Sequence, residues 1–355
     1  MKNSLDKKVI VLTGGGTAGH VYPALAVKER LGEEYQVHYI GGNGMEKDIV
    51  KQEKDIVYHQ IDAVKLQRKL TVKNLLIPYK LFKSISLCKQ ILKELKPNVI
   101  FSKGGFVALP VVIAGRSLKI PIVSHESDLS MGLANKIILR YCDYMATAFE
   151  KTCQGKKKCI YTGQPIRRKV LNGNKNNLPF LNRLDKKKKN LLVVGGSSGA
   201  KFLNELIEKD VDFILKKFNV IHITGKGYNK QINKNNYIQI DYADNIGDFL
   251  NLCDIVLSRA GSGAINEFLT LKKPMLLIPL SRKCSRGDQI ENAKLFTELG
   301  LSEMIEEENY TSEILIEKLE KLDKNANIFK KNMEKIKNFD ACDKIIEIIK
   351  KIERD

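Results

Sequence analysis

The stretch KVIVLTGGGTAGHVYPALAVKERL, residues 8–31, decides the expected fold of the first half of the chain. An apolar run at 8–12 is followed by four glycines within 14–19 and then by a helical pattern at 21–31. This order predicts a strand, a tight glycine turn and a helix. Unpaired N–H groups at such a helix start attract a phosphate, and glycine lets it approach closely. The same turn is common without a ligand, so alone it indicates only a fold.

Further apolar runs follow at 36–40, 98–101 and 121–124, and they alternate with amphipathic segments. Strands that alternate with helices are typical of βαβ units, whose strands form a parallel sheet. The first half of the chain is therefore predicted to be a doubly wound α/β domain.

The second half repeats this opening. A polar, basic stretch begins near residue 151 and ends in four lysines at 186–189, after which an apolar run at 191–194 leads into GGSSG at 195–199. A helix is expected from about Ala200. Further strands are predicted at 220–224, 237–240, 255–258 and 275–279.

Isoleucines at helical spacing in 340–352 predict a last helix that packs back on a domain. The length of 355 residues exceeds the usual size of one hydrophobic core, so two domains are expected. The expected division is a first domain over 1–163, a linker over 164–189, a second domain over 190–338 and a helix over 339–355 that packs on the first.

Composition narrows the class of protein. Charged residues make up 28% of the chain, which is ordinary globular usage. There is no apolar stretch long enough to span a membrane and no signal peptide, which favours a cytoplasmic location. The seven cysteines are odd in number and without a CxxC pair, so no disulfide framework or zinc site is indicated and buried cysteines are expected.

The net charge of +19 draws a protein to nucleic acid, anionic membrane or phosphorylated substrates, unless the lysines only cover solvated faces. Between 64 and 93 there are eight basic residues and no acidic ones, interleaved with apolar side chains. Such a stretch suits the anionic inner leaflet, and a solvated helix pair is the alternative. Nucleic-acid binding lacks a reader motif or an aromatic platform.

A dinucleotide-dependent dehydrogenase would carry an acidic residue about 20 positions after the first glycine turn, where it holds a ribose. Here the second apolar run ends instead in Gly41-Gly42-Asn43. The dehydrogenase alternative is therefore disfavoured.

Polar, glycine-containing segments follow several predicted strands, where ligands bind in open parallel sheets. In chain order, from Val9 to about Gly300, they resemble the undecaprenyl-pyrophosphoryl-muramylpentapeptide N-acetylglucosaminyltransferase family. The segments that carry the resemblance are GGTAGHVYPALA (15–26), SKGGFVALPVVIA (102–114), HESDLSMGLANK (125–136), QPIRRKV (164–170), GGSSGAKFLNE (195–205), SRAGSGAINE (258–267) and DQIENA (288–293).

The resemblance implies an α/β fold of two facing Rossmann-like domains, the GT-B arrangement, with a cleft between them. It implies inverting transfer of N-acetylglucosamine from UDP-N-acetylglucosamine to the 4-hydroxyl of the lipid-linked muramyl sugar, at the cytoplasmic face of the membrane. No cofactor is expected, and since no DxD-type acidic pair is present, no metal either. A UDP-N-acetylglucosamine epimerase or a glycolipid synthase of the same fold is the alternative.

Donor contacts are implied mainly for the second domain. Glu267 matches the carboxylate that holds the ribose diol, and two acceptor oxygens suit a diol. Gln289 matches a residue placed against the donor sugar, and Arg167 matches a linker arginine that reaches the nucleotide. The uridine is expected near Tyr242 and Ala243. The positions that match diphosphate contacts are Ser197, Ser262, Gly263 and Ala264.

Acceptor contacts are implied for the first domain. His20 is a candidate general base because histidine titrates near neutrality, and His125 and Glu126 are rival bases that can equally well brace their loop. Asp128 replaces an amide of many members, which turns a potential hydrogen-bond donor into an acceptor. Ala18 and Gln164 also depart from the family pattern. One matching loop, which in the family faces the donor's N-acetylglucosamine and is expected to cradle the acceptor's diphosphate, comprises Thr17, Ala18 and Gly19. A second acceptor loop comprises Gly104, Gly105 and Phe106.

Overall fold

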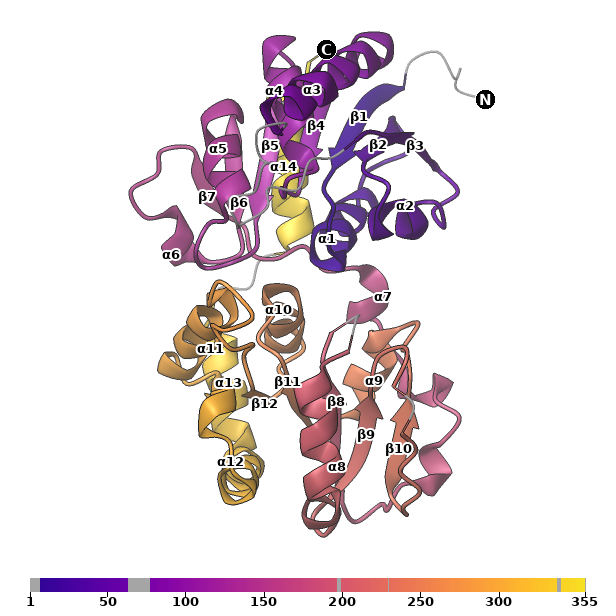
Figure 1. Cartoon of the computed structure of the whole chain (residues 1–355), viewed down its shortest axis with the longest axis vertical. Helices are drawn as coiled ribbons and strands as arrows, with labels where there is room; N and C mark the ends of the chain where they lie inside the picture. Colours follow the sequence, from indigo (N-terminus) through magenta and orange to yellow (C-terminus); the bar gives the residue numbers. More distant parts are fainter. Residues whose placement is uncertain (1–6, 63–76, 197–198, 229, 337–339, 355) are drawn as a thin grey trace. The chain divides into compact units, whose positions relative to one another are not determined.

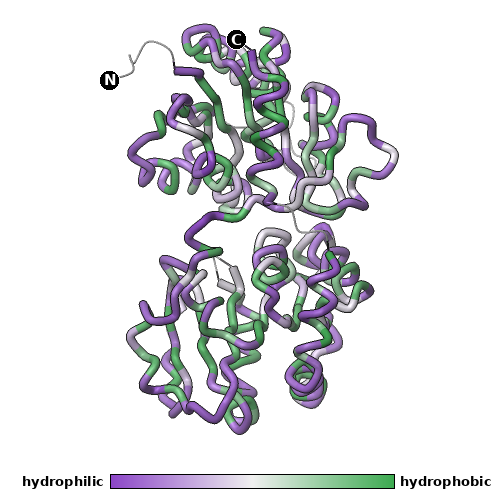
Figure 2. The backbone as a smooth tube through the Cα atoms, turned by 180° about the vertical axis from the view of Figure 1, so that it is seen from behind, coloured by the Kyte–Doolittle hydropathy of each residue, from purple (hydrophilic) through white to green (hydrophobic). Residues whose placement is uncertain are grey.

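The computed structural model describes residues 7–62, 77–196, 199–228, 230–336 and 340–354. The chain divides into two compact units: Met1–Arg167 with Phe339–Asp355, and Arg168–Asn338. Figure 1 shows each unit as a sheet with helices on its faces. In Figure 2 the strands of both units are largely green, that is hydrophobic, as expected for strands covered on both faces.

The first unit contains a seven-stranded sheet of order β3-β2-β1-β4-β5-β6-β7, and the paired strands are parallel. The strand order reverses between β1 and β4, which is the place where ligands bind in such sheets. The strands are β1 (Lys8–Thr13), β2 (Tyr35–Gly41), β3 (Ile56–Gln60), β4 (Val99–Ser102), β5 (Ile122–Glu126), β6 (Tyr144–Thr147) and β7 (Cys159–Tyr161).

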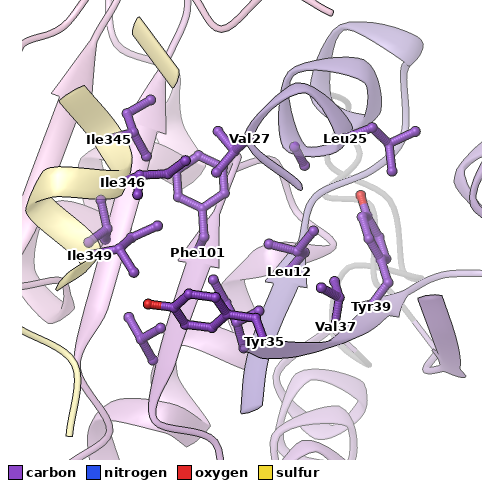
Figure 3. Close-up of a cluster of buried hydrophobic side chains, with 14 of the residues drawn as sticks. Leu12, Leu25, Val27, Tyr35, Val37, Tyr39, Phe101, Ile345, Ile346 and Ile349 are labelled. Atoms are coloured by element: carbon purple, nitrogen blue, oxygen red, sulfur yellow. The ribbon is translucent and has the colours of Figure 1, made fainter. Parts of the chain in front are cut away.

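The helices of the first unit include the last helix of the chain. Ile345, Ile346 and Ile349 of that helix, α14, pack in one buried cluster with Leu12 and Phe101 of the sheet (Figure 3). The helices are α1 (Ala18–Lys28), α2 (Met45–Val50), α3 (Ile77–Leu95), α4 (Ala108–Ser117), α5 (Leu133–Tyr141), α6 (Glu150–Cys153) and α14 (Ala341–Ile352).

The second unit repeats the design with a six-stranded parallel sheet of order β10-β9-β8-β11-β12-β13. Its strands are β8 (Lys189–Val194), β9 (Phe218–Ile223), β10 (Tyr237–Ile240), β11 (Ile255–Ser258), β12 (Met275–Leu277) and β13 (Ser302–Met304). Its helices are α7 (Arg168–Leu171), α8 (Lys201–Leu215), α9 (Ile246–Leu252), α10 (Ser262–Thr270), α11 (Asp288–Glu298), α12 (Ser312–Lys324) and α13 (Ala326–Lys335), with 3-10 turns η2 (Lys175–Asn177), η3 (Leu181–Arg183) and η4 (Glu307–Asn309).

The predicted α/β class with two Rossmann-like domains is confirmed by these two sheets. The stretch expected as a linker, 164–189, contains α7, η2 and η3, and residues 168–189 belong to the second unit. Gly173 there approaches Gly247 so closely that a Cβ would lie 2.0 Å from its carbonyl oxygen.

The expectation of buried cysteines is wrong for three of the seven. Cys284 is exposed because it lies in the loop before α11, and Cys153 and Cys159 are partly buried. Among the described residues, no helix has the length and apolar character needed to cross a membrane.

Candidate active site

In the first unit, two glycine loops meet where the strand order reverses. The loop Gly14–Gly16 follows β1, and Lys103, Gly104 and Gly105 follow β4. The backbone N–H of Lys103 donates to the Thr13 carbonyl at 2.7 Å. Gly104 and Gly105 have φ values of 84° and 81°, which favour glycine. A Cβ on Gly105 would lie 3.2 Å from the Gly15 carbonyl oxygen, so the two loops are in contact.

His20 stands in the first turn of α1, beside both loops. Its Nδ1 lies 3.0 Å from the hydroxyl of Thr17, and its ring is near Gly105, where a Cβ would be 3.5 Å from His20 Cε1. The ring is partly buried, Thr17 and Gly19 are exposed, and Ala18 is buried. The structure thus brings these four predicted residues together with Gly104 and Gly105.

His125 is fully buried at the end of β5, and its Nε2 donates to the Gly163 carbonyl at 2.9 Å. Burial holds the pKa of His125 well below its usual value, and the nearby charge of Lys103 lowers that pKa further. The imidazole is therefore neutral around pH 7, and one of its two nitrogens is committed to a backbone contact.

Glu126, the next residue, is also buried, and its carboxylate accepts three N–H groups. One oxygen accepts from the Asp128 backbone at 2.9 Å. The other accepts from the Gly132 backbone and from the Asn135 amide, both at 3.0 Å. These contacts brace the loop between β5 and α5. Of the three residues predicted as possible bases, His20 is the one whose side chain is not buried.

Asp128 and Phe106 are partly buried residues of the same region. Asp128 lies in the turn after β5, where its carbonyl accepts from the Thr152 hydroxyl at 3.4 Å. Its side chain therefore projects from a turn that Glu126 and Thr152 hold in place.

Two buried charged residues were missed by the sequence reasoning. Lys103 is 1% exposed and its ammonium donates to the Ser127 hydroxyl at 2.6 Å. Glu46 is 2% exposed, and its carboxylate accepts from the backbone of Gly16 at 3.2 Å and of Gly42 at 3.1 Å. Glu46 therefore ties the first glycine loop to the end of β2.

In the second unit, α10 begins directly after β11. Gly261 caps the helix, and Ser262 in its first turn is buried. A Cβ on Gly261 or Gly263 would meet no atom within 4 Å, so the surface there is open. The N–H groups of a helix start and the positive end of its dipole attract a phosphate, so this helix start suits one. Ala264, also in the first turn, is partly buried.

Glu267 lies further along α10. Burial raises the pKa of its carboxyl to about 7, and burial is the one cause of this rise among the described residues. A carboxylate in this condition gains from two hydroxyl donors, such as those of a vicinal diol.

The loops after β11 and β12 are tied to each other. Arg259 donates to the Ile278 carbonyl at 3.0 Å and pairs with Glu307 at 2.5 Å. Gln289 in α11 accepts from the Leu280 backbone at 3.0 Å through its side-chain oxygen. Gln289 therefore orders the loop after β12.

The loop after β10 carries Tyr242, which is 38% exposed, and Ala243, which is partly buried. The Lys226 ammonium, from the loop after β9, lies 5.0 Å from the Tyr242 ring centre. Ser197, expected to contact the diphosphate, lies outside the described residues.

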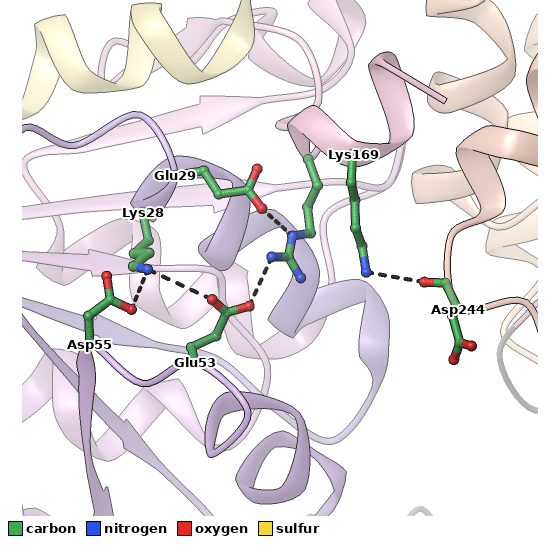
Figure 4. A network of polar contacts seen from close by, with 7 residues as sticks. Lys28, Glu29, Glu53, Asp55, Lys169 and Asp244 are labelled. Atoms are coloured by element: carbon green, nitrogen blue, oxygen red, sulfur yellow. Dashed lines mark hydrogen bonds and ion pairs between the residues drawn. The ribbon is translucent and has the colours of Figure 1, made fainter. Parts of the chain in front are cut away.

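Arg167 belongs to the first unit. Its guanidinium pairs with Glu29 at 2.5 Å and with Glu53 at 2.9 Å, two carboxylates labelled in Figure 4. The structure thus gives Arg167 two acidic partners within its own unit. In the part of the chain that the structure describes, no group of three or more His, Cys, Asp or Glu side chains could hold a metal ion.

Comparisons with known proteins follow this division. Residues 10–147 match the glycosyltransferase family 28 N-terminal domain, and residues 190–347 match the glycosyltransferase family 28 C-terminal domain. A Clostridium tetani protein named UDP-N-acetylglucosamine--N-acetylmuramyl-(pentapeptide) pyrophosphoryl-undecaprenol N-acetylglucosamine transferase is 44% identical, over 97% of this chain and 98% of its own length.

Two solved structures share the fold. MurG from Acinetobacter baumannii superposes with a TM-score of 0.74 at 24% identity, over 97% of this chain and 99% of that one. A UDP-GlcNAc 2-epimerase from Neisseria meningitidis has a TM-score of 0.64 at 15% identity, over 97% of this chain and 100% of that one. A transferase and an epimerase thus have the same fold, so the fold alone does not select the reaction.

The family predicted from the sequence motifs is confirmed by the two domain matches and by the full-length relative. The protein is a glycosyltransferase, and the chain belongs to glycosyltransferase family 28.

Proposed function

We propose that the protein transfers N-acetylglucosamine from UDP-N-acetylglucosamine to the 4-hydroxyl of the muramyl sugar of undecaprenyl-pyrophosphoryl-muramylpentapeptide, with inversion at the anomeric carbon. The observation that carries the proposal is the 44% identity, over nearly the whole of both chains, to a relative named for this transfer. The reaction belongs to peptidoglycan synthesis.

Donor binding is proposed for the second unit. The start of α10, from Ser262 to Ala264, takes the diphosphate, because its N–H groups and dipole stabilise the negative charge that grows on departing UDP. Glu267 takes the ribose diol, Gln289 the sugar, and the backbone at Ala243 the uridine. Ser197 is a further proposed diphosphate contact. Arg167 is a further proposed contact of the nucleotide. To make this contact, its guanidinium has to leave the ion pairs with Glu29 and Glu53.

Acceptor binding is proposed for the two touching glycine loops of the first unit, with Phe106 and Asp128 beside them. His20 is the proposed base. In the tautomer whose Nδ1–H donates to Thr17, Nε2 carries the lone pair that accepts the proton of the 4-hydroxyl. The hydroxyl oxygen attacks the anomeric carbon from the face opposite UDP, and the C–O bond to UDP breaks in the same step. His125 and Glu126 are proposed to hold the loop.

The transfer is tested with purified protein, UDP-N-acetylglucosamine and the lipid-linked acceptor in detergent, with EDTA present. A β-1,4-linked disaccharide is the expected product. Folded protein that forms no disaccharide, either with EDTA or with added divalent metal, would overturn the proposal. Formation of UDP-N-acetylmannosamine without acceptor, followed by NMR, would favour the epimerase alternative. If the transfer required added divalent metal, only the expectation that no metal is needed would be overturned.

Membrane binding is a second part of the proposal and rests on α3. Tyr79 is 69% exposed and Phe82 is 72% exposed, with the exposed Lys80 and Lys83 between and beside them. Aromatic side chains next to lysines suit the interface of an anionic leaflet. We propose that α3 binds the cytoplasmic face of the cell membrane and that the positive charge does not serve nucleic acid. Much of the predicted basic stretch, residues 63–76, lies outside the described residues.

Co-sedimentation with phosphatidylglycerol vesicles tests this part. Replacing Lys80 and Lys83 by Gln should weaken binding by about tenfold or more, since each basic residue contributes on the order of 1 kcal/mol near an anionic surface. Lys330→Gln with Lys331→Gln, on the exposed face of α13, makes the same change in charge elsewhere. Equal effects of the two double variants would show that only total charge matters and would refute the assignment to α3.

A further inference from the structure

Lys103 occupies the point of the first sheet where the strand order reverses. It follows β4 directly and precedes the glycine pair of the second acceptor loop. Lysine is rarely fully buried unless it is paired, yet this side chain is 1% exposed. A lysine retained in such a place needs a reason beyond packing.

The side chain of Lys103 contacts two segments that carry proposed acceptor residues, the first glycine loop and the turn after β5. Its Cβ supports the first glycine loop, since a Cβ on Gly14 would lie 3.0 Å from it. Its ammonium donates to the Ser127 hydroxyl at 2.6 Å, and that hydroxyl donates to the Gln164 side-chain oxygen at 2.7 Å. A chain of hydrogen bonds thus joins β4, the turn after β5 and the segment after β7.

The charges around this ammonium are carboxylates from β5 and its turn. Burial lowers the pKa of Lys103 to about 8, and the charges of Glu126 and Asp128 oppose that fall. The ammonium and these two carboxylates are opposite charges and attract each other. Glu126 is buried and already accepts three N–H groups. Asp128 is partly exposed and is therefore the carboxylate that a sugar hydroxyl can reach.

We propose that Lys103 is a positioning residue of the acceptor site, a buried counter-charge that joins the two acceptor loops and holds the Asp128 carboxylate ready to accept a hydrogen bond from a hydroxyl of the acceptor sugar. This inference rests on the proposed acceptor assignment in the first unit. It also gives Asp128 a defined partner. Many family members have an amide at this position, and the negative charge of the aspartate is balanced here by the Lys103 ammonium.

A purely structural lysine would behave differently. Removing one partner of a buried charge pair destabilises the fold, because the remaining charge is left without compensation, and this loss is not specific to one substrate. A structural role therefore predicts that Lys103→Met leaves the acceptor KM unchanged. A counter-charge for substrate-binding Asp128 predicts instead that the acceptor KM rises.

The test is a double-mutant cycle with Lys103→Met, Asp128→Asn and the double variant, assayed with the lipid-linked acceptor in detergent. Each single variant should raise the acceptor KM by about tenfold, whereas the donor KM should stay within about twofold. The double variant should be about as impaired as one single variant, because residues that act as a pair are not additive. Lys157→Met, an exposed lysine before β7, is the matched control.

Single effects that multiply in the double variant, or an unchanged acceptor KM in Lys103→Met, would overturn the inference. Wild-type protein that transfers no sugar would instead overturn the proposed function, so the two failures are distinguishable.

If Lys103→Met does not fold, the pairing of Lys103 with Asp128 is tested by the pH dependence of the acceptor KM, compared between wild type and Asp128→Asn. Glu126 and Asp128 are the carboxylates whose charges act on Lys103, Lys103 acts in turn on His125, and His20 lies near Gly14, as Lys103 does. Deprotonation of Lys103 should raise the acceptor KM of the wild type at alkaline pH, and this rise should be absent in Asp128→Asn, which has no carboxylate that depends on the counter-charge. An equal alkaline rise in Asp128→Asn would refute the pairing.

Discussion

The two units share one strand order but differ in what lies beneath their carboxyl edges. The first unit has buried charges there: Lys103, Glu126 and Glu46 each hold a loop through their side chains. The second unit presents the open start of α10, the Glu267 carboxylate, whose pKa is raised by burial, and the Arg259–Glu307 ion pair that ties its loops. The same fold therefore supports two kinds of surface.

This difference follows from the proposed ligands. A diphosphate carries its own charge and needs N–H groups and a helix dipole, which backbone supplies without buried side-chain charge. A neutral sugar hydroxyl needs oriented acceptors and a base, and these have to be held by other side chains. Variants in the two units should therefore fail in different ways.

The largest effect is expected for His20→Ala. Loss of a general base typically lowers the rate by about 10²- to 10⁴-fold, so kcat should fall by that factor while the donor KM changes little. Steady-state kinetics with both substrates varied measures this. His59→Ala, at a partly buried histidine of β3, is the control. A kcat for His20→Ala within threefold of wild type would remove His20 as the base.

A smaller effect, confined to donor binding, is expected for Glu267→Ala. Hydrogen bonds to a charged group contribute about 1.5 to 3 kcal/mol each, so the affinity for UDP should fall by on the order of 10- to 100-fold. Isothermal titration with UDP measures it, with exposed Glu298→Ala on α11 as the control. Unchanged UDP affinity would show that the ribose lies elsewhere.

The sequence predicted the elements that have strong patterns. The glycines after β1 indicate a tight turn by their composition alone. The isoleucines of α14 indicate a helix because they recur at helical spacing. Strand β3, IVYHQ, was missed because half of it is polar, and β13 was missed because it has three residues, SEM. Both strands lie at an edge of their sheet, and this position explains why their runs of apolar residues are short or interrupted.

The candidate site was predicted through motifs, and its supporting charges were not. A lysine or a glutamate in a sequence is most often a solvated residue, so Lys103 and Glu46 gave no signal until the fold showed their burial. The one available hint for Lys103 is its place between an apolar strand and two glycines. Likewise, nothing in the sequence separates His20 from His125, whereas burial and the contact with Gly163 do.

The free energy of unfolding allows the buried carboxylates of the two units, Glu126 and Glu267, to be compared directly. Glu126→Gln replaces an acceptor of three N–H groups by an amide whose NH₂ cannot accept them. Buried donors left without a partner cost about 1 to 3 kcal/mol, so the free energy of unfolding should fall by that amount. Urea denaturation measures it, with exposed Glu150→Gln on α6 as the control. Full stability with lost activity would instead favour Glu126 as a catalytic residue.

Glu267→Gln should change the free energy of unfolding in the opposite direction, and only at alkaline pH to the full extent. A carboxyl whose pKa is about 7 in the folded state and near 4.5 when unfolded binds more protons in the folded state between these values. The wild-type protein therefore loses stability as pH rises from about 4.5 to 7, and the loss is complete above 7. Glutamine has no charge to bury, so at pH 8 the variant should be more stable by on the order of 1 to 3 kcal/mol. Urea denaturation at pH 8 and at pH 5 should show this gain shrinking as the pH falls. A gain of equal size at both pH values would mean that packing, and not the buried charge, explains it.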